Sequence, residues 1–154
     1  MESIIAPGRI RYVNRGKTGG CIFCVDSLRD ESLVLHEGTS CYVIMNKYPY
    51  TSGHLMIAPY RHVARIGTVT EDELLELMKL TGQTVEVLTS AFSPEGFNIG
   101  LNMGRAAGAG YEDHLHLHVV PRWFGDTNFI TVLGETRIIP EEIEKTRDLL
   151  RTLF

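Results

Sequence analysis

Short runs of apolar and strand-favouring residues recur along the chain, bounded by polar or glycine-containing segments. We expect strands at residues 33–35, 41–45, 54–58, 97–103 and 115–121. The sequence Glu37-Gly38-Thr39-Ser40 is typical of a turn and predicts a hairpin between the first two strands. Because the strands cluster in hairpins instead of alternating strictly with helices, the pattern predicts an α+β fold with an antiparallel sheet of about five strands.

Two longer segments carry apolar residues at helical spacing and predict the two main helices. Thr70-Glu71-Asp72-Glu73 has the form of a capping box and opens the first helix, which we expect to end near Ser93-Pro94. Its apolar face is predicted to contain Leu74, Met78, Val85, Leu88 and Phe92. Pro140 suits the start of a second, C-terminal helix. The apolar face of this second helix is predicted to contain Ile143, Leu149, Leu150 and Leu153.

A length of 154 residues fits one domain with its own core. Residues 1–20 combine Pro7 with several glycines and basic residues, so we expect an irregular arm there and a single domain over residues 21–154.

The net charge of -4 argues against a protein that coats a nucleic acid polymer, since that binding mode needs an excess of Lys and Arg. No apolar run approaches the length of about 20 residues that a membrane span needs, and the first residues lack the pattern of a signal peptide. Three cysteines do not make a secreted disulfide framework, and Cys41 reads as a small buried side chain. We therefore expect a cytoplasmic protein that binds neither a membrane nor a nucleic acid polymer.

Three of the six histidines fall within five positions, at His114, His116 and His118. Since side chains alternate along a strand, these imidazoles are expected on one face, with neighbours roughly 7 Å apart at the Cα level. Two kinds of chemistry need such a row. Two or three imidazoles bind a zinc ion, or one imidazole acts as the nucleophile at a phosphate.

The segment Asn102 to Gly110 is rich in small residues. Their backbone N–H groups can approach an anion closely, as a phosphate cradle requires. Beside three histidines, this segment favours the phosphate over the metal.

The run His114-Leu115-His116-Leu117-His118-Val119-Val120 resembles the signature of the histidine triad superfamily, His-φ-His-φ-His-φ-φ with φ apolar. The segments 46–50 and 120–129 are most similar to the branch with diadenosine tetraphosphate phosphorylases and fragile histidine triad hydrolases. The resemblance implies a HIT-like fold, a homodimer, no organic cofactor, and cleavage of dinucleoside polyphosphates at an α-phosphate with water or phosphate as acceptor. A purine nucleoside phosphoramidase, a zinc-dependent hydrolase using all three histidines, and a binding module without turnover are the alternatives.

The same resemblance implies roles for single residues. His116 would form a nucleotidyl-histidine intermediate, and His118 would hydrogen-bond the phosphate or the scissile oxygen, so that catalysis rests on the triad His114, His116 and His118. The substrate-binding residues implied are Asn46 at the ribose, His54 behind the nucleophile, Trp123, and Asn102 with Gly108, Ala109 and Gly110 at the phosphate. The family's usual Gln or Ser shortly before the triad is replaced here by Gly110-Tyr111-Glu112-Asp113.

Cys21-Ile22-Phe23-Cys24 has the spacing of half a zinc site. The resemblance implies that His62 and His114 complete it around a structural Zn²⁺. Two reduced core cysteines are the alternative, and a thioredoxin-like pair is disfavoured because no strand precedes Cys21.

Overall fold

A computed structural model describes residues 20–25, 29–126 and 142–154, and all structural statements refer to these residues. Three short 3-10 helices are η1 (Glu31–Leu33), η2 (Ile66–Thr68) and η3 (Arg105–Ala107). The strands are β1 (Val34–Glu37), β2 (Cys41–Met45), β3 (Leu55–Pro59), β4 (Gly96–Leu101) and β5 (Leu117–Arg122). The α-helices are α2 (Glu71–Phe92) and α4 (Ile143–Arg151).

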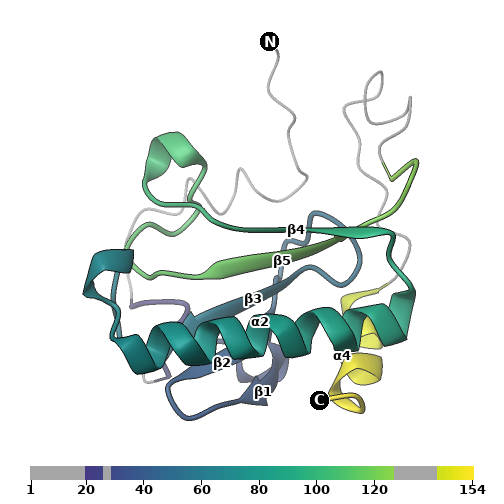
Figure 1. Ribbon diagram of the computed structural model, residues 1–154, viewed down its shortest axis with the longest axis horizontal. Helices are drawn as coiled ribbons and strands as arrows, with labels where there is room; N and C mark the ends of the chain where they lie inside the picture. The colour runs from purple at the N-terminus through teal and green to yellow at the C-terminus, as the bar shows by residue number, and fades with distance from the viewer. Residues whose placement is uncertain (1–19, 26–28, 127–141) are drawn as a thin grey trace.

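The five strands form one antiparallel sheet in the order β1-β2-β3-β5-β4, so that β1 and β4 are its edges. Helix α2 runs across one face of the sheet, with α4 beside it near β1 (Figure 1). The predicted α+β class, the antiparallel five-stranded sheet and the two main helices are confirmed.

Alternate residues of β2 face opposite sides of the sheet. Cys41 Sγ donates to the carbonyl of Glu73 in α2 over 3.6 Å, whereas Tyr42 Oη donates to the carbonyl of Phe23 over 2.6 Å. The segment with the cysteine pair therefore covers the face of the sheet that α2 leaves open.

Both bonds of the predicted capping box are present at the start of α2. Thr70 Oγ1 accepts from the Glu73 N–H at 3.3 Å, and Glu73 Oε2 accepts from the Thr70 N–H at 2.8 Å. The helix ends before Ser93, which adopts the left-handed conformation with φ 47°. Its buried face was only partly predicted, because Met78 is 58% exposed whereas Leu77 and Leu80 are buried. The many leucines at the start of this helix fit more than one apolar face.

Helix α4 buries Leu150 and Thr146, and Arg151 fixes it to the sheet by donating to the carbonyl of Val34. The prediction that Leu149 and Leu153 belong to its apolar face was wrong, because these side chains are 41% and 39% exposed. The helix lasts only from 143 to 151, so position 153 follows its end.

Pro140 and nearly all of the predicted arm over residues 1–20 lie outside the described residues. Within the described residues, none of the helices has the combined length and apolar content needed to cross a bilayer.

Candidate active site and metal-binding group

A cavity of about 330 Å³ opens on the face of the sheet that α2 does not cover. Its floor crosses three strands in register, because His118 of β5 lies opposite Met56 of β3, and Met56 lies opposite Ile44 of β2. Ile22 and Phe23 also line it. The walls are thus mainly apolar, with polar groups at a few positions, as is typical of small-molecule sites.

The three motif histidines do not form the predicted row. β5 begins only at Leu117, since the Leu115 N–H donates to the carbonyl of Val63 instead of joining the sheet. His116 and His118 line the cavity, and their ring centroids lie 4.9 Å apart. His114 turns toward the cysteine pair. Only His118 lies in a strand, so the regular alternation expected for all three does not hold at His114 and His116. The Phe23 ring nonetheless contacts both of these imidazoles, on the side of the sheet that α2 leaves open.

His116 is buried, and its Nδ1 lies 2.8 Å from the carbonyl oxygen of His114. A carbonyl only accepts, so Nδ1 carries the proton and Nε2 keeps its lone pair. Burial lowers the pKa of His116, although the bond to the His114 carbonyl acts in the opposite direction. The ring of Phe23 stacks on the imidazole at a centroid distance of 4.6 Å. The result is a neutral, fixed imidazole with one nucleophilic nitrogen.

A chain of hydrogen bonds fixes the tautomer of His118. The Tyr50 N–H donates to His54 Nδ1 at 3.1 Å, so the proton of His54 must be on Nε2. His54 Nε2 lies 2.9 Å from His118 Nδ1, which therefore accepts. His118 Nε2 is left as the N–H donor. The Asn102 amide lies 3.4 Å from it and accepts this hydrogen with its oxygen in the position assigned to Nδ2, since Nδ2 itself only donates. We call this chain from Tyr50 through His54 to His118 the tautomer relay.

His54 was expected behind the nucleophile, but its ring nitrogen meets His118 instead of His116. The side chain is fully buried. Any effect of His54 on a ligand in the cavity would therefore pass through His118, the third histidine of the motif.

The remaining predicted substrate-binding residues divide into two groups. Asn46, Gly108 and Gly110 line the cavity, and Gly108 has the positive φ of 83° that favours glycine. Ala109 and Trp123 do not line it. The Trp123 indole N–H donates to the carbonyl of Phe92 over 3.4 Å, at the end of α2, which places this tryptophan in a structural contact.

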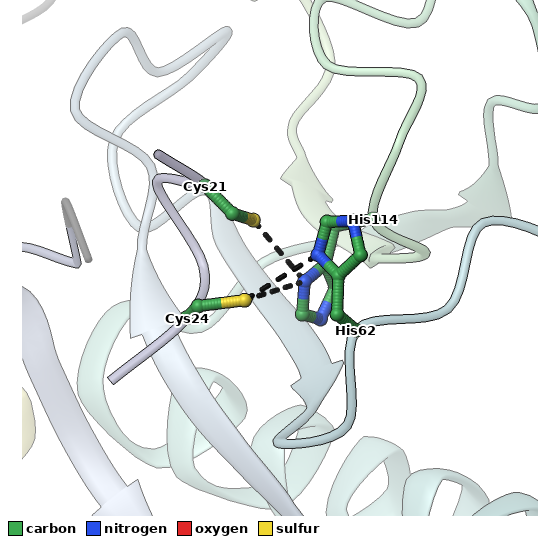
Figure 2. A group of neighbouring side chains, drawn as sticks. All are labelled: Cys21, Cys24, His62 and His114. Carbon is green, nitrogen blue, oxygen red and sulfur yellow. Dashed lines mark hydrogen bonds between the residues drawn. The ribbon is translucent and has the colours of Figure 1, made fainter. Parts of the chain in front are cut away.

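The predicted metal-binding side chains do come together, from three separate segments (Figure 2). Cys21 Sγ lies 3.2 Å from His114 Nδ1, and Cys24 Sγ lies 3.4 Å from His62 Nδ1 and 3.7 Å from His114 Nδ1. All four ligand atoms lie within 4.8 Å of one another. A tetrahedral zinc ion with ordinary Zn–S and Zn–N bonds separates its ligand atoms by about 3.3–3.8 Å, so the spacing fits.

The protonation of His114 also suits a metal ligand. Its Nε2 lies 2.8 Å from the carbonyl oxygen of Pro59 and carries the proton, which leaves Nδ1 to face the thiols. Burial lowers the pKa of His114 to about 4. Because His114 points at Cys21 and Cys24, it cannot also join His116 and His118 around a catalytic metal. The geometry argues against the three-histidine zinc hydrolase.

Sequence reasoning missed the part that Phe23 plays. It was treated as a spacer between two cysteines, yet its ring covers His116 and its carbonyl holds Tyr42. Its apolar character between two metal-ligand candidates was the available signal. Asp30, Lys47 and Tyr111 also line the cavity without having been singled out.

The comparisons with known proteins agree with the fold and with the histidine motif. The sequence model that describes the HIT domain family matches residues 28–125 of this chain, which is more than half of its length. The chain therefore belongs to the histidine triad (HIT) family, as the motif resemblance indicated. An AP-4-A phosphorylase of Mycobacterium tuberculosis is 46% identical over 123 residues, which cover 80% of this chain and 63% of that protein.

Two further similarities concern an enzyme and a solved structure. A bis(5'-nucleosyl)-tetraphosphatase of Schizosaccharomyces pombe is 30% identical over 110 residues, covering 71% of this chain and 57% of that protein. A crystal structure of a zinc-bound histidine triad family protein from Mycobacterium smegmatis has a TM-score of 0.64 and 26% identity, covering 79% of this chain and 82% of that one. The chain thus spans less than two thirds of the length of the first two relatives.

Proposed function

We propose that this chain is a nucleotidyl hydrolase or transferase that cleaves dinucleoside polyphosphates at an α-phosphate through His116. The observation that carries the proposal is the bond from His116 Nδ1 to the His114 carbonyl, which leaves the Nε2 lone pair available beside the cavity. A neutral imidazole is a competent nucleophile at physiological pH. The names of two relatives, a phosphorylase and a tetraphosphatase, support this substrate class.

In the first step, His116 Nε2 attacks the α-phosphorus, and the bond from phosphorus to the bridging oxygen breaks. The nucleotide stays on Nε2, and the polyphosphate leaves with the other nucleoside. His118 Nε2–H, held in that tautomer by the relay, donates to the leaving oxygen or a phosphoryl oxygen. The Gly110 N–H at the cavity supplies a donor for the spreading negative charge, whereas the Gly108 N–H is held by the Arg105 carbonyl at 2.9 Å.

In the second step, an acceptor attacks the same phosphorus and breaks the phosphorus–nitrogen bond, which restores neutral His116. Water as acceptor releases AMP and ATP from diadenosine tetraphosphate, whereas inorganic phosphate as acceptor releases ADP and ATP. Both acceptors use the same first step.

A product assay tests this function. Wild-type protein is incubated with diadenosine tetraphosphate, with and without phosphate, and the nucleotides are separated by chromatography. We expect cleavage that His116→Ala abolishes and that the matched control His36→Ala, at a half-buried histidine outside the cavity, retains. Adenosine phosphoramidate, assayed in parallel, addresses the phosphoramidase alternative, supported by the 29% identity to adenosine 5'-monophosphoramidase hnt1 of Schizosaccharomyces pombe. If no nucleotide product forms from diadenosine tetraphosphate, the proposed function is wrong.

We also propose that Cys21, Cys24, His62 and His114 hold a structural zinc ion. When bound, the metal would crosslink the segment before η1 to the segment before β5, with no part in the chemistry. Metal analysis of the purified chain should give about one zinc per chain, and Cys24→Ser should lower this content while His36→Ala does not. Loss of turnover on brief chelation, with the fold intact, would argue for a catalytic metal instead.

A homodimer is the proposed assembly. Strand β4 is an edge of the sheet, and Ile99 in it is 45% exposed, so this edge can pair with a second copy. Ile99→Lys should shift the mass measured by light scattering from dimer to monomer, and a wild-type monomer would contradict the proposal. The cytoplasmic location stays a prediction from the sequence.

A further inference from the structure

The floor of the cavity gives a bound nucleotide a direction. His118, Met56 and Ile44 are directly opposed on β5, β3 and β2, and Val34 of β1 continues the row. Neighbouring strands lie about 4.8 Å apart, so the row leads away from His118 by that distance at each strand. With its α-phosphate at His116 and His118, a nucleotide extends its ribose and base toward η1.

An ion pair stands at the η1 end of this cavity. Asp30 precedes η1, Lys47 follows β2, and both line the cavity. Lys47 Nζ lies 3.6 Å from Asp30 Oδ2, and the side chains are 63% and 41% exposed. The neighbouring lining residues Leu33 and Ile44 are apolar. An apolar slot with one acceptor and one donor at its rim suits a flat ring with a polar edge.

Asp30 is held in one orientation. Its Oδ1 accepts from the Ser32 N–H at 3.2 Å and from the Ser32 hydroxyl at 2.6 Å, as the N-cap of η1. Oδ2 is directed to Lys47. The hydrogen bond from the Ser32 hydroxyl lowers the pKa of Asp30, and Lys47 acts in the same direction. The carboxylate is therefore ionised at neutral pH and can only accept.

We propose that Asp30 and Lys47 read the base of the nucleotide and select adenine. Asp30 Oδ2 accepts a hydrogen bond from the 6-amino group, and Lys47 Nζ donates to N1. A keto oxygen at position 6 would instead face a carboxylate, and neither atom could donate. This inference rests on the proposed function, because it takes its direction from a phosphate at His116 and His118.

Binding of three ligands to the full chain tests the inference without requiring turnover. AMP has the 6-amino group, purine riboside 5'-monophosphate lacks it, and IMP has a keto oxygen in its place. By isothermal titration calorimetry, we expect AMP to bind wild-type protein about tenfold more tightly than purine riboside 5'-monophosphate, as for one partly exposed hydrogen bond to a charged group. IMP should bind more weakly still, because its protonated N1 also loses the hydrogen bond from Lys47.

Two variants assign the effect to the ion pair. Asp30→Asn keeps an oxygen for Ser32 but presents an amide N–H to position 6 of the base. The preference for AMP over IMP should therefore be lost without reversing, because the N1–H of IMP still faces Lys47. Lys47→Met should weaken AMP and purine riboside 5'-monophosphate, which share the N1 acceptor, more than IMP. Asp72→Asn is the matched control, since Asp72 is exposed in the first turn of α2 and does not line the cavity.

Equal binding of the three ligands to wild-type protein, or an unchanged ratio of AMP to IMP affinity in Asp30→Asn, would overturn the inference. If Asp30→Asn fails to fold, the wild-type series decides alone. A chain that cleaves the polyphosphate without discriminating among the three ligands refutes base reading alone. A chain that discriminates among them but cleaves nothing refutes the proposed function and leaves base reading intact.

Discussion

Replacing His54 tests the tautomer relay most directly. In His54→Leu, the Tyr50 N–H loses its acceptor and His118 Nδ1 loses its donor, in two part-buried hydrogen bonds to a fully buried side chain. Each buried group left without a partner costs about 1–3 kcal/mol. Because leucine recovers part of this by apolar burial, we expect a loss of about 2–4 kcal/mol in the free energy of unfolding. That is a large part of the stability of an ordinary domain.

The effect on catalysis is separate from the effect on stability. Without the relay, the proton of His118 can occupy either ring nitrogen, so only part of the population presents Nε2–H to the phosphate. We expect kcat for diadenosine tetraphosphate to fall about tenfold to a hundredfold, the usual range for groups that orient a ligand-binding imidazole. KM should change less, because the apolar walls of the cavity remain. His54→Gln, with one acceptor and one donor, should recover part of the loss.

Three measurements check this prediction. Urea unfolding gives the stability, steady-state kinetics separate kcat from KM, and long-range ¹H–¹⁵N NMR identifies the protonated ring nitrogen of His118. His36→Leu serves as the control, since His36 stacks on Phe154 away from the cavity. The relay is refuted if NMR finds the proton of wild-type His118 on Nδ1, or if His54→Leu leaves both kcat and the tautomer unchanged.

Three further predictions concern the framework. Thr70→Ala removes one half of the capping box and should lower the free energy of unfolding by about 1 kcal/mol in urea titrations, whereas an unchanged midpoint would contradict the capping role. The hydrogen bond from Arg61 lowers the pKa of Glu73 from 4.5 to about 2, so its stabilisation is complete above about pH 4.5 and is lost as the pH falls toward 2. Glu73→Gln should flatten the plot of unfolding free energy against pH between about pH 2 and 4.5. A plot identical to that of the wild-type protein would refute the role of Glu73. Burial raises the pKa of Cys41 to about 12, so iodoacetamide at pH 8 should modify Cys24 in metal-free folded protein but spare Cys41, as read by mass spectrometry.

Sequence rules that act over a few positions were sufficient to predict which strands and helices form. The hairpin of β1 and β2 and the start of α2 at Thr70 follow from turn and capping residues that act within a few positions. The prediction of the apolar face of α4 was wrong because Arg151 and the end of the helix decide which side of the helix meets β1. That contact joins residues more than 100 positions apart, and the periodicity of one segment carries no information about it.

The motif predicted which histidines matter but not how they are arranged. Alternation along a strand was applied to residues 114–118, although the strand begins at Leu117. His54 was assigned to the wrong triad partner because the bond to His118 depends on the register between β3 and β5. The tautomers could not be predicted either, since the Tyr50 N–H and the His114 carbonyl that fix them are backbone groups without a sequence signature.

His114 explains why the three histidines of the motif are not equivalent. Its side chain faces Cys21 and Cys24, while its carbonyl accepts the Nδ1 proton of His116. Groups that hold the imidazole of His114 also hold the carbonyl that sets the tautomer of His116, the proposed nucleophile. His54 sets the tautomer of the neighbouring His118 by donating to its Nδ1. Two imidazoles thus offer opposite groups, a lone pair on Nε2 of His116 and a proton on Nε2 of His118, and backbone groups and a third imidazole are sufficient to set both tautomers.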